Sequence, residues 1–141
     1  MSRKIIDVAV IGVGNIGFHH ARNYSQISNA KLVAVSDIDE VRGQAVAEKF
    51  GCKFYSDYKV MLKEESIDAI SLCLPISLHH VVGMELIHAG KYVLIEKPLA
   101  ATTKQACELD AAAKSKGMLL TVGHIERFNP AVQELKRRID A

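Results

Sequence analysis

Six short apolar runs, rich in β-branched residues, alternate along the chain with longer and more polar stretches. Because the runs are mostly apolar, without alternating polar positions, they are typical of parallel strands that helices cover on both faces. The runs are Ile5–Ile11, Lys31–Val35, Lys53–Tyr55, Ala69–Leu74, Tyr92–Ile95 and Met118–Val122. Alternation of this length predicts right-handed βαβ units. The sequence therefore predicts an α/β fold with a doubly wound parallel sheet of about six strands.

The polar stretches carry helix boundary signals. Residues suited to N-caps precede four of them, and glycines suited to helix ends follow three. The expected caps are Asp39, Asp57, Ser77 and Thr102, with Gln105 completing a capping box after Thr102, and the expected ends are Gly51, Gly90 and Gly117. A last helix is expected after Asn129 and Pro130, with an apolar stripe of Val132, Leu135 and Ile139.

Composition excludes several classes of protein. A length of 141 residues favours one domain, and 18 Lys and Arg against 16 Asp and Glu give no sign of a nucleic-acid or membrane partner. The three cysteines are far apart and no histidine pair has ligand spacing, so we expect neither a disulfide framework nor a metal site. Residues Met1–Lys4 lead directly into a short strand rather than a signal peptide, so the protein is expected to be cytoplasmic.

A glycine-rich hexapeptide follows the first expected strand and opens the first expected helix. It is Gly12-Val13-Gly14-Asn15-Ile16-Gly17, which matches Gly-x-Gly-x-x-Gly. Gly12 permits the tight turn, Gly14 lets a pyrophosphate approach the backbone, and Gly17 allows close packing of helix and strand. Free amides at the helix start would then face the phosphates. The alternative is a plain tight turn between strand and helix.

Asp37 follows the second strand, twenty positions after Gly17. A carboxylate there can accept hydrogen bonds from both ribose hydroxyls of adenosine and repels a 2′-phosphate, which favours NAD over NADP. The alternative role of capping a helix also suits Asp37, although Asp39 competes for it. Arg42 is expected to lie too far along the helix to bind a phosphate.

Two other kinds of nucleotide site use similar residues. Gly90-Lys91 lacks the earlier glycine and the following Ser or Thr of a P-loop, so that class is excluded. An S-adenosylmethionine site can also use a glycine-rich first turn and an acidic second strand. A methyltransferase therefore stays an alternative.

The segment Ala89–Ala100, with Glu96-Lys97-Pro98 at its centre, resembles the signature of the glucose–fructose oxidoreductase/inositol dehydrogenase (Gfo/Idh/MocA) family. Further matches in register are the glycine turn, Ser56–Tyr58, Ile67–Ala69, and Pro75 followed by His79. The resemblance covers nearly the whole chain and implies a Rossmann fold. The family's Thr and Asn beside the proline are Leu74 and Ile76 here, so cofactor contacts at that strand end depart from the family pattern.

The resemblance implies roles for individual residues. Lys97 is implied as the catalytic residue that hydrogen-bonds the substrate hydroxyl at the nicotinamide, Glu96 lies near the nicotinamide ribose, and a cis bond precedes Pro98. The full set expected to bind the cofactor NAD is Gly12, Gly14, Asn15, Ile16, Gly17, Asp37, Leu74, Pro75, His79, Glu96 and Lys97. Two structural alternatives stay open, namely an exposed ion pair at Glu96 and Lys97, and a capping or packing role for His79. His19 and His20 are expected to be surface or internally hydrogen-bonded residues, and His88 a surface residue.

The segment Gly123–Pro130 matches the family's junction between the dinucleotide domain and a second domain. The sequence from His124 to Pro130 resembles that of family members that oxidise the 3-hydroxyl of UDP-N-acetylglucosamine-type sugars. We therefore expect residues 1–122 to form a dinucleotide-binding domain and residues 123–141 to begin a linker helix to an absent substrate domain. His124 either faces the nicotinamide or substrate, or is a buried histidine bonded to the backbone.

The expected function is hydride transfer between a sugar or nucleotide-sugar hydroxyl and NAD, with poor activity without the second domain. The expected partners are NAD(H) and, in the full-length enzyme, a sugar or UDP-sugar. An apolar patch around Phe128, Val132 and Ile139 suggests a homo-oligomer. The alternative class is a non-catalytic nucleotide-binding or redox-sensing module, which has no need of a cation at Lys97.

Overall fold

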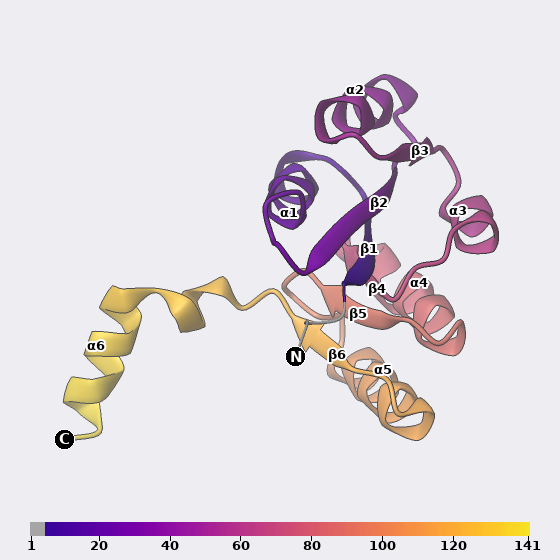
Figure 1. The fold of residues 1–141 in the computed structure, drawn as a ribbon. Coiled ribbons are helices and arrows are strands. Elements are labelled where there is room, and N and C mark those ends of the chain that lie inside the picture. The colour runs from indigo at the N-terminus through magenta and orange to yellow at the C-terminus, as the bar shows by residue number, and fades with distance from the viewer. Residues whose placement is uncertain (1–4) are drawn as a thin grey trace.

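The computed structural model describes residues 5–141 and shows one parallel sheet with helices on both faces (Figure 1). The strands are β1 (Ile6–Ile11), β2 (Ala30–Ser36), β3 (Lys53–Tyr55), β4 (Ala69–Leu72), β5 (Tyr92–Ile95) and β6 (Leu120–Val122). The helices are α1 (Asn15–Tyr24), α2 (Glu40–Phe50), α3 (Tyr58–Glu64), α4 (Ile76–His88), α5 (Thr103–Lys116), the 3₁₀ helix η1 (Ile125–Phe128) and α6 (Pro130–Ile139). Met1–Lys4, on which the expectation of no signal peptide depends, lie outside the described residues.

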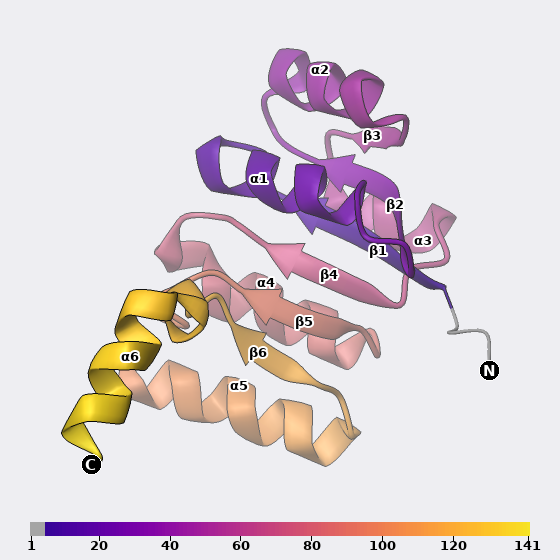
Figure 2. The same ribbon diagram turned by 60° about the vertical axis from the view of Figure 1, so that its left-hand side comes forward.

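The strand order is β3-β2-β1-β4-β5-β6, and each neighbouring pair is parallel. This order confirms the predicted doubly wound sheet, and it is the order of the Rossmann fold. The winding direction reverses between β1 and β4, so the loops after these strands diverge and leave a crevice at their carboxyl ends. Figure 2 shows the six strands stacked edge to edge, with helices in front of and behind them.

The central strand β1 explains why the apolar runs lack polar alternation. Val8 and Val10 pack into one buried cluster with residues of α1 and α2. Ala9 and Ile11 point to the opposite face and join a second cluster with residues of α3, α4 and α5. Because successive strand side chains point to opposite faces and both faces are covered, the buried positions Val8–Ile11 are all apolar.

The helix boundary predictions are confirmed at most sites. The side chains of Asp39, Asp57 and Thr102 accept hydrogen bonds from the amides that follow them, and Gly51 and Gly117 end their helices in the left-handed conformation. Ser77 was wrong as a cap, because the N-cap of α4 is Pro75, two positions earlier, and Ser77 lies inside the helix. A proline fixes its own φ and suits the start of a helix. No helix within residues 5–141 has both the length and the apolarity to cross a membrane.

The C-terminal segment, residues 125–139, projects from the sheet (Figure 1). The predicted cap is confirmed, since Asn129 Oδ1 accepts a hydrogen bond from Ala131 N and Pro130 opens α6. Within this segment no residue of η1 or α6 is buried. The predicted stripe is exposed, at 41% for Val132, 58% for Leu135 and 74% for Ile139.

Candidate functional site

The glycine turn lies at the carboxyl end of β1, beside the end of β4. Gly12 has φ +83°, and a Cβ on it would lie 2.6 Å from the carbonyl oxygen of Cys73. A Cβ on Gly17 would lie 1.8 Å from the carbonyl oxygen of Gly12. A Cβ on Gly14, in contrast, would meet nothing within 4 Å. Packing therefore requires glycine at positions 12 and 17, whereas Gly14 borders open space.

The start of α1 faces that space. Gly14 is the N-cap, and within residues 5–141 no side chain caps this helix start. The first amides of a helix lack partners inside the helix and attract anions. A pocket of about 500 Å³ adjoins the turn and is lined by Val13, Gly14, Asn15, Phe18, His19, Arg42 and Val46. These residues fit the pyrophosphate and adenosine end of a dinucleotide.

Asp37 lies at the end of β2, next to the glycine turn, and is only 6% exposed. Its Oδ2 accepts a hydrogen bond from Val13 N at 2.8 Å, and its Oδ1 accepts one from Asp39 N at 2.9 Å. Burial raises the pKa of this carboxyl, but hydrogen bonds from the Arg42 side chain and from the two amides outweigh burial and hold the pKa below its ordinary value. Asp39, not Asp37, caps α2, so the competing role of Asp37 as a helix cap is not realised.

Arg42 lies beside Asp37 and Asp39 and lines the pocket at the glycine turn, whereas the expectation that it does not bind a phosphate stays a prediction. Its Nη2 is 2.7 Å from Asp37 Oδ1, its Nε is 3.2 Å from Asp37 Oδ2, and its Nη1 is 2.9 Å from Asp39 Oδ2. Since α2 begins at Glu40, Arg42 lies in the first helical turn and reaches back to the strand end. The available signal was the N-cap at Asp39, which places Arg42 three residues inside the helix.

A chain of hydrogen bonds leads from α1 to the end of β5. His20 Nε2 lies 2.9 Å from Glu96 Oε1, and His20 Nδ1 lies 3.0 Å from Ser71 Oγ. Ser71 Oγ is in turn 2.8 Å from the hydroxyl of Tyr24. The other oxygen of Glu96 accepts a hydrogen bond from the amide of Lys97. The prediction of an internally hydrogen-bonded His20 is confirmed, and the pairing of Glu96 with His20 replaces the alternative of an ion pair between Glu96 and Lys97.

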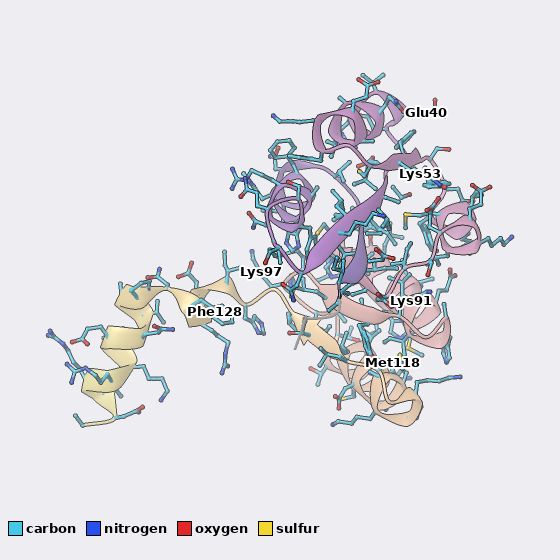
Figure 3. All side chains as sticks on the ribbon, in the orientation of Figure 1. Glu40, Lys53, Lys91, Lys97, Met118 and Phe128 are labelled. Atoms are coloured by element: carbon cyan, nitrogen blue, oxygen red, sulfur yellow. The ribbon has the colours of Figure 1, made fainter. Side chains whose placement is uncertain are left out.

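Lys97 is exposed at the end of β5, and the peptide bond between Lys97 and Pro98 is cis, as the resemblance implied. Figure 3 shows Lys97 where the C-terminal segment leaves the sheet, with Phe128 further along that segment. A pocket of about 690 Å³ lies here, lined by Lys97, Pro98, Gly123, His124, Ile125, Glu126, Arg127, Val132, Gln133 and Lys136. His124 is exposed in it, so the alternative of a buried histidine is wrong.

His79 lies in the position that the alternative of a packing role predicts. Its ring is only 2% exposed. The Nδ1 atom lies 2.9 Å from the carbonyl oxygen of Pro98, and Nε2 lies 2.7 Å from that of Leu74. Each ring nitrogen therefore lies within hydrogen-bond distance of a backbone carbonyl. His79 ties the loop after β4 to the loop after β5, and Pro75 at the N-cap of α4 fixes the first of these loops.

A glycine turn, an uncapped helix start and a buried aspartate at the next strand end together define a dinucleotide-binding α/β domain. A family model described as "Oxidoreductase family, NAD-binding Rossmann fold" matches residues 6–124. The chain belongs to this Gfo/Idh/MocA family of oxidoreductases. This membership decides against the methyltransferase alternative.

Two curated relatives are informative. The chain is 36% identical over 140 residues to inositol 2-dehydrogenase 1 of Saccharopolyspora erythraea, covering 96% of this chain and 42% of the relative. It is 37% identical over 128 residues to UDP-N-acetylglucosamine 3-dehydrogenase of Acidithiobacillus ferrooxidans, covering 91% and 40%. The structure of that second enzyme superposes with a TM-score of 0.86 at 34% identity, over 94% of this chain and 43% of the other. The chain thus spans about two fifths of the curated relatives it matches.

Cofactor-bound neighbours differ in their dinucleotide. GenD2 from gentamicin A biosynthesis was solved in complex with NAD, and it matches 85% of this chain and 34% of its own at 32% identity, with a TM-score of 0.83. A variant of the 3-ketoreductase KijD10 from Actinomadura kijaniata was solved with NADP, and it matches 97% of this chain and 44% of its own at 27% identity, with a TM-score of 0.91. The shared fold therefore serves both cofactors, and the preference must come from side chains around the adenosine ribose.

Proposed function

We propose that this chain binds NAD(H) and is the dinucleotide-binding part of an oxidoreductase that moves hydride between a sugar, inositol or nucleotide-sugar hydroxyl and NAD. The observation that carries the proposal is the hydrogen bond from Val13 N to Asp37, which fixes a buried carboxylate beside the glycine turn. Pyrophosphate and adenosine ribose are adjacent in a dinucleotide, so their binding groups must be adjacent too. The named relatives, which include inositol and UDP-sugar dehydrogenases, support the substrate class.

Different residues of the chain would bind the pyrophosphate, the two riboses and the substrate. The backbone at Gly14, Asn15, Ile16 and Gly17 would hold the pyrophosphate, and Asp37 would accept hydrogen bonds from the adenosine ribose. The bound nicotinamide supplies the hydride acceptor or donor. Lys97 Nζ would donate a hydrogen bond to the substrate oxygen, where a cation stabilises the negative charge that develops as the hydroxyl loses its proton. Glu96, held by His20, would contact the nicotinamide ribose.

Residues 1–122 would form the dinucleotide domain, and residues 123–141 would join it to a substrate domain. The exposed stripe of α6 supports this division, because an amphipathic helix is stable when its apolar face is covered. The pocket at Lys97 is open and lined largely by the C-terminal segment. We therefore propose that these 141 residues bind dinucleotide but turn over sugar poorly.

The test is a calorimetric titration of the chain with NADH, in the wild type and in the variant Asp37→Ala. We expect the wild type to bind and Asp37→Ala to weaken binding by about tenfold or more, the cost of losing a charge-assisted hydrogen bond. Asp110→Ala is the matched control, because Asp110 is an exposed carboxylate on α5 that pairs with Lys114. A folded wild type that binds no NADH, or an Asp37→Ala variant that binds as well as Asp110→Ala, contradicts the proposal.

A second measurement addresses Lys97 and the proposed poor turnover. With NAD⁺ and either myo-inositol or UDP-N-acetylglucosamine, the chain is expected to form little NADH. Turnover on the order of 1 s⁻¹ or faster, which is ordinary for an enzyme, would show that the described pocket is complete by itself. If turnover is seen, Lys97→Met must abolish it while dinucleotide binding persists.

A further inference from the structure

Three polar side chains meet between α1 and the sheet, where a strand covered on both faces calls for apolar packing. His20 and Tyr24 are four positions apart on α1 and therefore lie on the same side of that helix. Ser71 lies within β4 and is 0% exposed. A buried polar group destabilises the fold unless it is hydrogen-bonded, so the partners of this cluster must be accounted for.

One direction of donation satisfies every group of the cluster. Burial raises the pKa of the Tyr24 hydroxyl, which therefore keeps its proton, and its recorded partner is Ser71 Oγ at 2.8 Å. When Tyr24 donates to Ser71, Ser71 can donate to His20 Nδ1, 3.0 Å away. A neutral ring whose Nδ1 accepts carries its proton on Nε2. His20 Nε2 lies 2.9 Å from Glu96 Oε1, which accepts that proton's hydrogen bond.

The opposite direction fails at both ends of the chain. A neutral His20 with its proton on Nδ1 would turn the lone pair of Nε2 toward the ionised carboxylate of Glu96, which also only accepts. Ser71 would then donate to Tyr24, whose own hydroxyl proton would lose its recorded acceptor. A donor left without an acceptor away from water destabilises the fold. The arrangement therefore favours the His20 tautomer that is protonated on Nε2.

Ser71, His20 and Glu96 follow the order of a Ser-His-acid triad, but they cannot act as one. The serine of such a triad attacks the substrate, and Ser71 is 0% exposed. The end of the chain that reaches the surface is Glu96, which directly follows β5 and whose side chain is 13% exposed. The cluster therefore acts on Glu96.

The carboxylate of Glu96 is held from three sides. His20 of α1 binds Oε1, and the amide of Lys97 donates to Oε2 at 3.1 Å. A Cβ on Gly123, which follows β6, would lie 2.5 Å from Oε1. An ionised carboxylate offers about four lone-pair sites, and the described residues use one on each oxygen. The acceptor positions that remain on the two oxygens suit the paired hydroxyls of a ribose.

We propose that His20 is a positioning residue of the dinucleotide site. It donates its Nε2 proton to Glu96, Ser71 and Tyr24 fix its tautomer, and the carboxylate is thereby oriented toward the two hydroxyls of the ribose that carries the nicotinamide. This inference rests on the proposed dinucleotide function. It adds that affinity for this second ribose depends on an internal hydrogen-bond chain, separate from the glycine turn.

The test is a calorimetric titration with ADP and with ADP-ribose, which differ by the second ribose. In His20→Gln the amide nitrogen lies near the place of Nε2 and can still donate to Glu96, whereas the shorter side chain in His20→Asn reaches only toward Ser71. We expect His20→Asn to lower ADP-ribose affinity by about tenfold, the value of a hydrogen bond to a charged group, and to leave ADP affinity unchanged. His20→Gln should keep most of the ADP-ribose affinity. The control is His88→Asn, at an exposed histidine that ends α4.

Each contrary outcome has a distinct meaning. Equal losses of ADP-ribose affinity in His20→Asn and His20→Gln, or equal losses of ADP and ADP-ribose affinity, overturn the positioning role. A folded wild type that binds neither ligand overturns the proposed function itself. Thermal unfolding checks that each variant is folded.

A direct readout of the tautomer needs no variant. Nitrogen-15 NMR of the imidazole ring distinguishes a protonated ring nitrogen from an unprotonated one. In the wild type at neutral pH we expect His20 to carry a proton on Nε2 and none on Nδ1. A proton on Nδ1 would contradict the direction of the chain, and the proposal would fail even if the variants do not fold.

Discussion

The glycine-turn region and the C-terminal segment differ sharply in how their residues are held. Around the turn, β1 is fully buried from Val8 to Ile11, and close contacts of Gly12 and Gly17 lock α1 against the sheet. In the segment from η1 to α6, all within the described residues, not one side chain is buried. The two regions nevertheless carry equally clear local signals, a glycine motif in one and a helix cap with an apolar stripe in the other.

The difference separates two sources of stability. The turn region is held by tertiary packing, whose loss would affect the whole domain. The ten residues of α6 are held by a cap, a proline and exposed ion pairs of Glu134 with Arg137 and Arg138. A helix of that length is marginal without packing. Changes of the same kind should therefore have very different consequences in the two regions.

The largest effect is expected at Gly17. In Gly17→Ala the new Cβ would lie 1.8 Å from the carbonyl oxygen of Gly12, a backbone atom that no rotamer change can move away. We expect the free energy of unfolding in urea to fall by about 5 kcal/mol, at the upper end for single substitutions. Gly14→Ala is the matched control, because its Cβ meets nothing within 4 Å. If the two variants unfold alike, the turn is not locked in the way described.

A pair of leucine substitutions compares the regions directly. Leu86 of α4 is 0% exposed in the larger buried cluster, and Leu135 of α6 is 58% exposed. Leu86→Ala is expected to cost about 2–5 kcal/mol through lost burial and a cavity, while Leu135→Ala should change the unfolding free energy by less than about 0.5 kcal/mol. Chemical denaturation of both variants measures this contrast. A large cost for Leu135→Ala would show that the stripe is covered in solution, for example by a second copy of the chain.

The sequence predicts the sheet and the glycine turn well because both depend on short-range rules. Apolar runs without alternation require a sheet covered on both faces, and the positive φ of Gly12 and the contact of Gly17 with Gly12 lie within the turn itself. The cap at Asp39 is equally local. These features could be predicted without knowing which distant segments meet.

The remaining parts of the site depend on contacts between distant residues. His20 meets Ser71 and Glu96 across 51 and 76 positions of sequence, and no local pattern signals that approach. His79 contacts Pro98 O across 19 positions of sequence, and no local pattern signals that contact either. Arg42 is different, since it lies only five positions from Asp37, and the N-cap at Asp39 places it in the first helical turn, within reach of that carboxylate.

The smallest expected effect concerns pH, and it compares a buried carboxylate with an exposed one. Burial of Asp37 raises its pKa, but the hydrogen bonds from Arg42 and the two amides lower the pKa by more than burial raises it. The pKa in the folded state therefore lies below the ordinary value. Hydrogen bonds from Arg137 and then Arg138 also lower the pKa of Glu134 on α6. A carboxyl whose pKa is lower in the folded state contributes stability above the unfolded pKa of about 4, and this contribution is lost as pH falls through the folded pKa.

The two carboxyls should nevertheless differ in what they contribute. Exposed ion pairs are screened by water and salt, so Glu134→Gln should leave the dependence of stability on pH close to that of the wild type. Asp37→Asn should lose stability at neutral pH, and its deficit should shrink as pH falls below about 4, where the wild type also loses its charge. Urea unfolding from about pH 7 to about pH 3 measures both curves, and added salt should remove any residual effect of Glu134 first. If Glu134→Gln changes the loss of unfolding free energy at acid pH as much as Asp37→Asn does, then α6 is held by more than local contacts. The contrast between the two regions then does not hold.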